Sequence, residues 1–261
     1  MRKQLELLTD RYLEDYRKLI NAALILPSLN LQKEFTAKDF EYYLQASSVY
    51  SSNIEGNTID FDTWLKNKAF KIKSKPKETA EIEDLLEAYN YATVNSLTQK
   101  SFLQTHQILS KTILALKSQR GKYRKQPVGI YSDGKLEYLA VEPEFVQREM
   151  DKLFRDISLL LETDMDMSEI LYYASMIHLL FEKIHPFMDG NGRAGRLLEK
   201  WFLVEKIGKN AWNFETEKYY AQHRTEYYQS IHIGFNYYAL KMDRFLPFSK
   251  MLISALGISP A

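Results

Sequence analysis

Twelve consecutive residues, His185 to Arg196, combine side chains that could handle a phosphate-bearing ligand. Their sequence is His-Pro-Phe-Met-Asp-Gly-Asn-Gly-Arg-Ala-Gly-Arg. The apolar residues that follow have helical spacing, so the glycine-containing turn is expected to open onto a helix N-terminus. Free backbone amides and the positive end of the helix dipole make such a helix start an anion site. The stretch therefore predicts a binding site for a polyphosphate.

The phosphate-binding group is expected to come from both backbone and side chains. Gly190 and Gly192 let the backbone approach a bulky ligand without a Cβ in the way. Arg193 and Arg196 are three residues apart, so both guanidinium groups project from one side of the first turn. Asn191 and the amides from Gly190 to Arg193 would neutralise phosphate charge as the transition state forms.

Two further residues indicate what happens to the phosphates. Asp189 could hold the Mg²⁺ that accompanies a nucleotide, or it could be a plain N-cap. His185 is placed to take a proton from a hydroxyl group that attacks phosphorus. A helix-capping turn alone would need neither the second glycine nor the paired arginines. The remaining histidines stand alone in helical sequence and are expected to be packing or surface residues: His106, His178, His223 and His232.

The stretch matches residue for residue the signature HPFxDGNGRxxR, and the chain resembles the Fic family, which moves AMP from ATP onto protein hydroxyl groups. The resemblance implies a Mg²⁺-dependent protein adenylyltransferase that modifies a Ser, Thr or Tyr of an unknown target protein or of the chain itself. It also implies that Arg193 meets the β-phosphate side and Arg196 the γ-phosphate. The retained Gly192-Arg193 favours AMP transfer over phosphorylation. The base of the nucleotide stays open.

An upstream stretch, Ser51-Ser-Asn-Ile-Glu55-Gly56, resembles the family's inhibitory motif. The resemblance implies that Glu55 pairs with Arg196 and removes the partner of the γ-phosphate, while Ser51 steadies the glutamate from one turn away. A charge-assisted contact of this kind is worth about 1.5–3 kcal/mol, enough to bias ATP into a wrong pose. From the residues alone, a glutamate at a helix end is ordinarily a surface charge.

Two short apolar runs around Asp133-Gly134 predict a single β-hairpin over about 128–139. With the preceding Gly121-Lys-Tyr-Arg124, it resembles the family's flap. Its edge would pair with the target's backbone; a plain surface hairpin is the alternative. The nearby Lys122, Arg124 and Lys125 could attract a substrate or simply be solvated. The expected docking residues are Val128, Gly129, Ile130 and Tyr131.

The rest of the chain predicts an all-α protein, a Fic-type helical bundle with one small β-hairpin flap. Apolar spacing predicts helices over 3–26, from 36, over 82–92 and 102–116, from 144 and from 168, followed by two or three closing helices. The charged run 66–77 is expected to be a solvated connection. The predicted division is an N-terminal helical segment with the inhibitory motif (1–75) and a Fic catalytic core with closing helices (76–261).

Composition narrows the partners and the compartment. A formal net charge of +1 gives no basic field, so nucleic acid is not an expected partner. There is no cysteine, which excludes disulfides and thiolate metal sites. The N-terminus reaches acidic residues too soon for a signal peptide, and no apolar run approaches a membrane span, so a cytoplasmic location without a membrane partner is expected. The oligomeric state stays open, with a homodimer as one option.

Two other functions also fit these residues. One is removal of AMP from a modified protein, with Glu55 positioning a water molecule. The other is a nucleotide-binding regulator with negligible turnover, against which the intact His185 argues.

Overall fold

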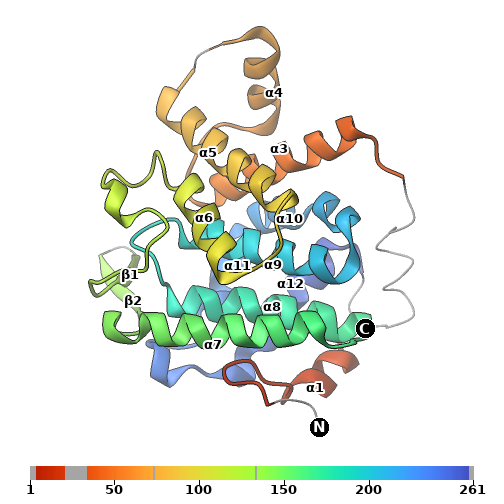
Figure 1. Cartoon of the computed structure of the whole chain (residues 1–261), viewed down its shortest axis with the longest axis vertical. Coiled ribbons are helices and arrows are strands. Elements are labelled where there is room, and N and C mark those ends of the chain that lie inside the picture. The colour runs from red at the N-terminus through yellow and green to blue at the C-terminus, as the bar shows by residue number, and fades with distance from the viewer. Residues whose placement is uncertain (1–3, 21–33, 73, 133, 259–261) are drawn as a thin grey trace.

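A computed structural model describes residues 4–20, 34–72, 74–132 and 134–258 as one helical bundle (Figure 1). The only strands in these residues are β1 (Gly129–Ser132) and β2 (Lys135–Leu139), which form an antiparallel hairpin. The predicted all-α class with one small hairpin is therefore confirmed. Nor does any helix of the described residues have the length and apolar character needed to cross a bilayer. The α-helices are α1 (Leu13–Lys18), α3 (Ala37–Ile54), α4 (Phe61–Phe70), α5 (Pro76–Thr93), α6 (Gln99–Leu109), α7 (Pro143–Glu162), α8 (Met167–Ile184), α9 (Asn191–Ile207), α10 (Thr216–Gln222), α11 (Arg224–Ile231) and α12 (Phe245–Ala255).

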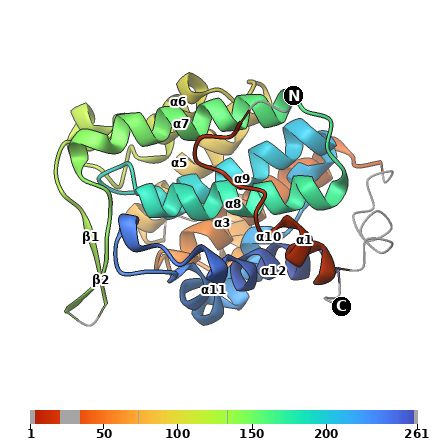
Figure 2. The ribbon, with the colours of Figure 1, turned by 90° about the horizontal axis from the view of Figure 1, so that it is seen from below.

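Helix α8 is the centre of the bundle. All of its residues from Ser168 to Ile184 are buried, and it packs against α1, α7, α9 and α12. Figure 2 shows α7 and α12 on opposite sides of α8. Because α8 and α9 pack closely together, they fix both ends of the short loop between them. That loop is the first half of the signature stretch.

Local sequence sets most helix boundaries. Thr36 and Asp39 form a capping box at the start of α3, and Asp166 with Glu169 forms another at α8. Pro76 and Pro143 occupy the first turns of α5 and α7, where a missing N–H costs nothing. The charge run between 66 and 77 is helical up to Phe70 in α4, so the expected solvated connection is shorter than predicted.

Helix α3 is tied to the bundle by polar groups as well as by apolar packing. It packs on α5, α9 and α10, and its four serines between positions 47 and 52 are buried. The Nζ of Lys200 on α9 donates to Ser47 Oγ at 2.7 Å, and Ser47 donates to Glu217 Oε2 on α10 at 3.0 Å. Tyr89 on α5 donates to the other oxygen of Glu217 at 2.6 Å. These buried contacts hold α3 in one register against α9.

The hairpin is joined to the bundle at the end of α8. Tyr138 on β2 is buried and donates to the carbonyl of Lys183 at 2.7 Å, and its ring lies 4.4 Å from Lys183 Nζ. Ile130 on β1 pairs with Tyr138, and a bulge follows it. Gly134, at φ +76°, makes the turn that the Asp-Gly signal predicted, while Asp133 lies outside the described residues. The hairpin is thereby held beside the signature loop.

The helix predicted over 3–26 is wrong for most of its length. Only α1 is helical in the described part, residues 4–12 are irregular, and residues 21–26 lie outside the description. The reason is a tertiary contact. The carboxylate of Asp156 on α7 accepts the amides of Glu6, Leu7 and Leu8, each at 2.8 Å, so these amides do not need helical partners. The helix predicted over 102–116 likewise ends at Leu109.

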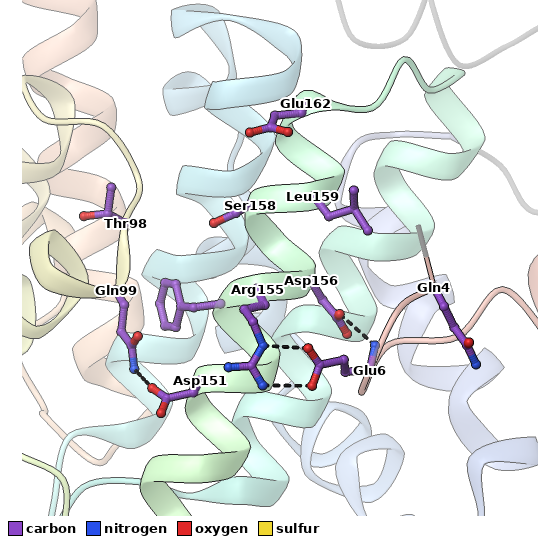
Figure 3. A pocket seen from close by; sticks show the side chains of 11 residues that line it. Gln4, Glu6, Thr98, Gln99, Asp151, Arg155, Asp156, Ser158, Leu159 and Glu162 are labelled. Atoms are coloured by element: carbon purple, nitrogen blue, oxygen red, sulfur yellow. Dashed lines mark hydrogen bonds and ion pairs between the residues drawn. The ribbon is translucent and has the colours of Figure 1, made fainter. Parts of the chain in front are cut away.

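A cavity of about 520 Å³ lies where this N-terminal segment crosses α6 and α7 (Figure 3). In this view Arg155 makes two contacts with the carboxylate of Glu6, at 2.6 and 2.8 Å. Asp156, beside it, is 2% exposed, whereas the side chains of Glu6 and Arg155 are 43% and 55% exposed. The buried acid is therefore the stronger anchor of the segment.

We expect Asp156→Ala to lower the free energy of unfolding by about 2–4 kcal/mol, because three amides lose a charged acceptor. Denaturant unfolding measures this loss. Glu6→Ala is the matched control, since it removes an exposed ion pair and should cost clearly less. Equal losses in the two variants would show that Asp156 is not the anchor.

Candidate active site

His185 ends α8 in a backbone conformation that few non-glycine residues adopt. Its φ of 50° and ψ of 61° lie in the left-handed region, and this turns the chain toward α9. Arg124 holds the turn, because its Nε donates to the carbonyl of His185 and its amide to that of Pro186, both at 2.8 Å. Arg124 is 3% exposed, so it supports the loop and cannot attract a substrate from the surface. Lys122 and Lys125 remain as candidates for that role.

The signature loop is clamped from within by Asn191. Its side chain accepts from the amide of Phe187 at 2.9 Å and donates to the carbonyl of the same residue at 3.0 Å. Its oxygen and one of its two N–H groups are engaged in the loop, so only the second N–H is left for the predicted contact with a phosphate. The backbone amide of Asn191 at the helix start can also face an anion.

His106 on α6 supports the same loop. Its ring stacks on Phe187 with centroids 3.5 Å apart and an interplanar angle of 7°. Its Nε2 lies 2.9 Å from the carbonyl of Asp189, and its Nδ1 lies 3.0 Å from the amide nitrogen of Gly121. Burial lowers the pKa of His106 to about 4, so the ring is neutral at neutral pH, with Nε2 as donor and Nδ1 as acceptor. This expected packing histidine therefore also positions the loop.

Helix α9 begins without a side-chain cap. Gly190, at φ +80°, is the N-cap, and a Cβ there would lie 2.9 Å from Ile113 and 3.0 Å from Leu109. The first-turn amides of Asn191, Gly192 and Arg193 have no hydrogen-bond acceptor among the described residues. The helix start that the sequence predicts as an anion site thus has free amides and a glycine N-cap, which is the geometry such a site needs.

Asp189 and Arg193 lie beside these amides. Asp189 is not the N-cap; its side chain is 53% exposed, and its Oδ1 accepts the amide of Gly190 at 2.6 Å. Arg193 is buried, with nitrogens 3.9 Å from Asp189 and 3.7 Å from Glu81 and no partner for its Nε among the described residues. These long contacts leave the Arg193 guanidinium free to bind an anion.

Arg196 is 1% exposed and binds several acceptors at once. Its Nε donates to Ser51 Oγ at 2.8 Å, and its Nη2 donates to Glu55 Oε1 at 2.8 Å and to the Ser51 carbonyl at 3.0 Å. Its Nη1 donates to Tyr227 at 3.2 Å. The structure thus contains the expected Glu55–Arg196 ion pair. Ser51, however, binds the arginine, and within the described residues it is not hydrogen-bonded to the glutamate it was expected to steady.

Glu55 lies directly over the start of α9. A Cβ on Gly192 would come within 2.1 Å of Glu55 Oε1 and 3.1 Å of Arg196 Nη1, so the glycine makes room for the carboxylate. Glu55 is the C-cap of α3, and Gly56 follows at φ +98°, in the left-handed region. Burial raises the pKa of Glu55, but Arg196 and Arg193 outweigh it and hold that pKa below its usual value. The carboxylate is therefore an anion bound at the anion site.

A cavity of about 840 Å³ connects these groups with the hairpin. Its wall includes Glu55, Gly192, Arg196 and His185, together with residues of β1, β2 and α11. Of the four predicted docking residues, Ile130 and Tyr131 line the cavity and Val128 and Gly129 do not. Burial lowers the pKa of His185 to about 4, so its imidazole is neutral and able to accept a proton.

Sequence analysis missed a chain of buried polar groups behind Arg196. Tyr227 on α11 contacts Arg196 and also His178 Nε2, at 3.0 Å, while His178 Nδ1 lies 2.9 Å from Glu199. The spacing of His178 and His185 on α8 could have indicated a shared helix face. No local pattern marks Tyr227, which reaches the site from a closing helix.

The described residues contain no group of three or more His, Cys, Asp or Glu side chains that could hold a metal ion by themselves. Mg²⁺ is usually bound by one or two carboxylates together with phosphate oxygens and water. Asp189 fits this pattern, because its side chain is half exposed beside the anion site and its Oδ2 has no partner among the described residues.

Comparisons with known proteins point to the Fic/DOC family. Residues 96–203 match the model of the Fic/DOC family. The protein adenylyltransferase Fic of Nematostella vectensis is 30% identical over 175 residues, which is 63% of this chain and 38% of the relative. A probable protein adenylyltransferase of Aquifex aeolicus is 45% identical over 51 residues, 20% of this chain and 16% of that protein. A Fic family protein from Desulfovibrio desulfuricans has a similar fold, with a TM-score of 0.73 and 21% identity over 97% of this chain and 74% of that chain. The chain thus spans well under half the length of these two sequence relatives.

The low pKa of His106 predicts a loss of stability in acid. The pKa of His106 is about 4 in the folded chain and 6.5 ordinarily. Between pH 4 and pH 6.5 the unfolded chain therefore binds a proton at this residue that the folded chain does not bind. Stability should therefore fall as the pH falls, by about 2 kcal/mol between neutral pH and pH 5 from this residue. His106→Gln, which does not titrate, should lose correspondingly less over the same range in denaturant unfolding. Parallel pH profiles of the two proteins would contradict this assignment.

Proposed function

The chain belongs to the Fic/DOC family through residues 96–203, and from this premise we propose that it transfers AMP from ATP to a Ser, Thr or Tyr hydroxyl of a protein. The observation that carries the proposal is the shared cavity. A neutral histidine, Gly192 at the start of α9 and the buried Arg196 line the same space, and the buried Arg193 follows Gly192 on the helix. A base beside a polyphosphate site is what the attack of a hydroxyl on the α-phosphorus requires.

In the proposed reaction His185 takes the proton of the target hydroxyl. The enclosed nitrogen of its ring is Nδ1, so Nε2, which opens to the cavity, is the proton acceptor. The target oxygen forms a bond to the α-phosphorus, and the bond from this phosphorus to the bridging oxygen breaks, so pyrophosphate leaves. Arg193, Arg196 and the α9 amides neutralise the charge that develops on the leaving group. Bound Mg²⁺, held by Asp189 and the phosphates, would add to this neutralisation.

The hairpin is the proposed docking element for the target. β1 pairs with β2 through one edge, and its other edge has no strand partner among the described residues. Ile130 and Tyr131 on this strand line the cavity and are 36% and 66% exposed. An extended target segment added to this edge would bring a hydroxyl group into the cavity that contains His185.

We further propose that Glu55 inhibits the transfer. Its carboxylate already binds Arg196 and covers Gly192, so it occupies the charge and the space that the end of a triphosphate would need. The free carbonyl of Ser51 also accepts from Arg196, and Tyr228 donates to the carbonyl of Ile54 at 3.0 Å. The end of α3 is thereby satisfied by the site itself, which keeps Glu55 in place.

Removal of AMP from a modified protein is a second candidate. The observation in its favour is that Glu55 and His185 line the same cavity, and the Glu55 side chain is 29% exposed. An acid and a base facing one space could position and activate water. A pre-labelled target that loses label with wild type, but not with Glu55→Gly, would favour this activity over transfer.

His185→Ala is expected to keep ATP affinity and to lose transfer, because the imidazole is not part of the phosphate-binding group. Calorimetry measures ATP binding, and incorporation of label from [α-³²P]ATP measures transfer to a target or to the chain itself. Labelling that persists in this variant would remove His185 from the mechanism.

Glu55→Gly is expected to raise the labelling rate on the order of thirtyfold, since about 2 kcal/mol of competing ion pair is lost. Glu55→Gln separates the causes, because it keeps the bulk and removes the charge. Glu41→Gly, at an exposed position of the same helix, controls for the effect of a glycine on α3 itself. Equal labelling by wild type and Glu55→Gly, at matched Mg²⁺, would overturn the inhibition and leave the transfer proposal standing.

A further inference from the structure

Two enclosed polar atoms near the base have no hydrogen-bond partner within the described residues. One is Nδ1 of His185 and the other is Oε1 of Glu182, one turn earlier on α8. The second oxygen of Glu182, Oε2, lies 3.9 Å from His185 Nδ1, which is too long for a hydrogen bond. Glu182 is 8% exposed and lines the same cavity as His185. An unpartnered acid and an unpartnered ring nitrogen therefore face each other at the catalytic position.

Glu182 is also held against the start of α9. A Cβ on Gly195 would lie 2.5 Å from Glu182 Oε1, so the carboxyl group packs where only glycine fits. Packing therefore fixes the position of the carboxyl group, since no hydrogen bond within the described residues does so. A buried carboxyl group without hydrogen bonds costs free energy unless another state of the site uses it.

We propose that Glu182 is the positioning residue of the base. In the active state of the enzyme its carboxylate accepts a hydrogen bond from Nδ1–H of His185, which leaves the Nε2 lone pair free for the target hydroxyl. When Nε2 takes the hydroxyl proton, the carboxylate stabilises the imidazolium that results. This inference rests on the proposed transfer reaction and names the group that orients its base.

Several charged and titratable groups act on Glu182. Its Oε2 lies 3.9 Å from His185 Nδ1, and it interacts with His178 and Lys183 of its own helix, Arg196 of α9, Glu55 of α3 and Tyr227 of α11. Burial raises the pKa of Glu182 and the negative charge of Glu55 raises it further, whereas His178, Arg196 and Lys183 lower it. Withdrawal of Glu55 would therefore favour the ionised acid that accepts the Nδ1 proton.

The main-chain carbonyl of Glu182 is the competing acceptor for His185. It acts to raise the pKa of the imidazole against the effect of burial, so it also faces the ring. Replacement of the side chain alone distinguishes the two acceptors, because every variant at position 182 keeps the carbonyl. Glu182→Gln is the sharpest change. It keeps the volume beside Gly195 but offers an N–H₂ group that can donate to Nδ1 and move the ring proton to Nε2.

The test compares Glu55→Gly with Glu55→Gly/Glu182→Gln, and uses Glu55→Gly/Glu149→Gln as the control. Glu149 is another buried acid, on α7, paired with Lys152 and Arg148. Nitrogen-15 NMR of the imidazoles at neutral pH, assigned with His185→Ala, reports the tautomer without any need for turnover. Labelling from [α-³²P]ATP reports kcat, calorimetry reports ATP affinity, and thermal unfolding reports whether each variant is folded.

We expect Glu182→Gln to shift His185 away from the Nδ1–H tautomer and to lower kcat about 10- to 100-fold, with ATP affinity unchanged and the Glu149 control unaffected. An unchanged tautomer with kcat within about twofold would overturn the inference and assign the orientation to the carbonyl. If no variant transfers AMP, the proposed function fails, and the tautomer comparison still decides whether Glu182 positions His185. If Glu182→Gln is unfolded, Glu182→Ala repeats the comparison, and a retained Nδ1–H tautomer there overturns the inference.

Discussion

The buried guanidinium of Arg196 is the constraint on which the arrangement around the site depends. An ion this deeply enclosed costs several kcal/mol unless its donors are satisfied. Its acceptors come from two elements that are distant in sequence, with Ser51 and Glu55 on α3 and Tyr227 on α11. Burial of this one arginine thus requires both α3 and α11 to lie beside α9. The proposed phosphate site and the packing of the bundle share this residue.

The same principle extends along α9. One turn after Arg196, Lys200 is fully buried and contacts Ser47 of α3 together with Glu217 of α10. The serines of α3 are short, so the helices approach closely and their hydroxyl groups replace water around the cations. Removing α3 would take Ser51 and Glu55 from Arg196 and Ser47 from Lys200, which is more costly than moving one side chain at the end of the helix. A change of state at the site is therefore expected to begin at Glu55, with the rest of α3 still docked.

Short sequence patterns predict the structural features that depend only on residues close together in the chain. The capping box at Thr36, the turn at Gly134 and the glycine-opened start of α9 all follow from short patterns. The fold class follows from apolar periodicity in the same way. The contact between Glu55 and Arg196 spans 141 residues, and only the resemblance to a known family suggested it.

The failures of sequence analysis have one physical origin, which is tertiary hydrogen bonding. Asp156 takes the amides of a segment about 150 residues away, and this contact overrides an apolar pattern that predicted helix. Arg124 resembles a surface cation in sequence, yet its side chain donates to the backbone carbonyls of His185 and Gln126. Asn191 and Ser51 were assigned to a ligand and to Glu55, whereas each satisfies a neighbouring protein group. Side chains with several hydrogen-bonding atoms have too many compatible partners for sequence spacing to choose among them.

Glu55 and Arg196 belong to the same chain, and this affects how a soluble anion can compete for Arg196. Glu55 is a tethered ligand of Arg196, so its local concentration is set by geometry, and dilution of the protein leaves it unchanged. For flexible tethers such effective concentrations are on the order of millimolar, and a helix held in register can exceed them. In the proposed reaction a soluble nucleotide competes against this fixed value, so occupancy of the site by nucleotide is expected to follow the nucleotide concentration and hardly to depend on the protein concentration.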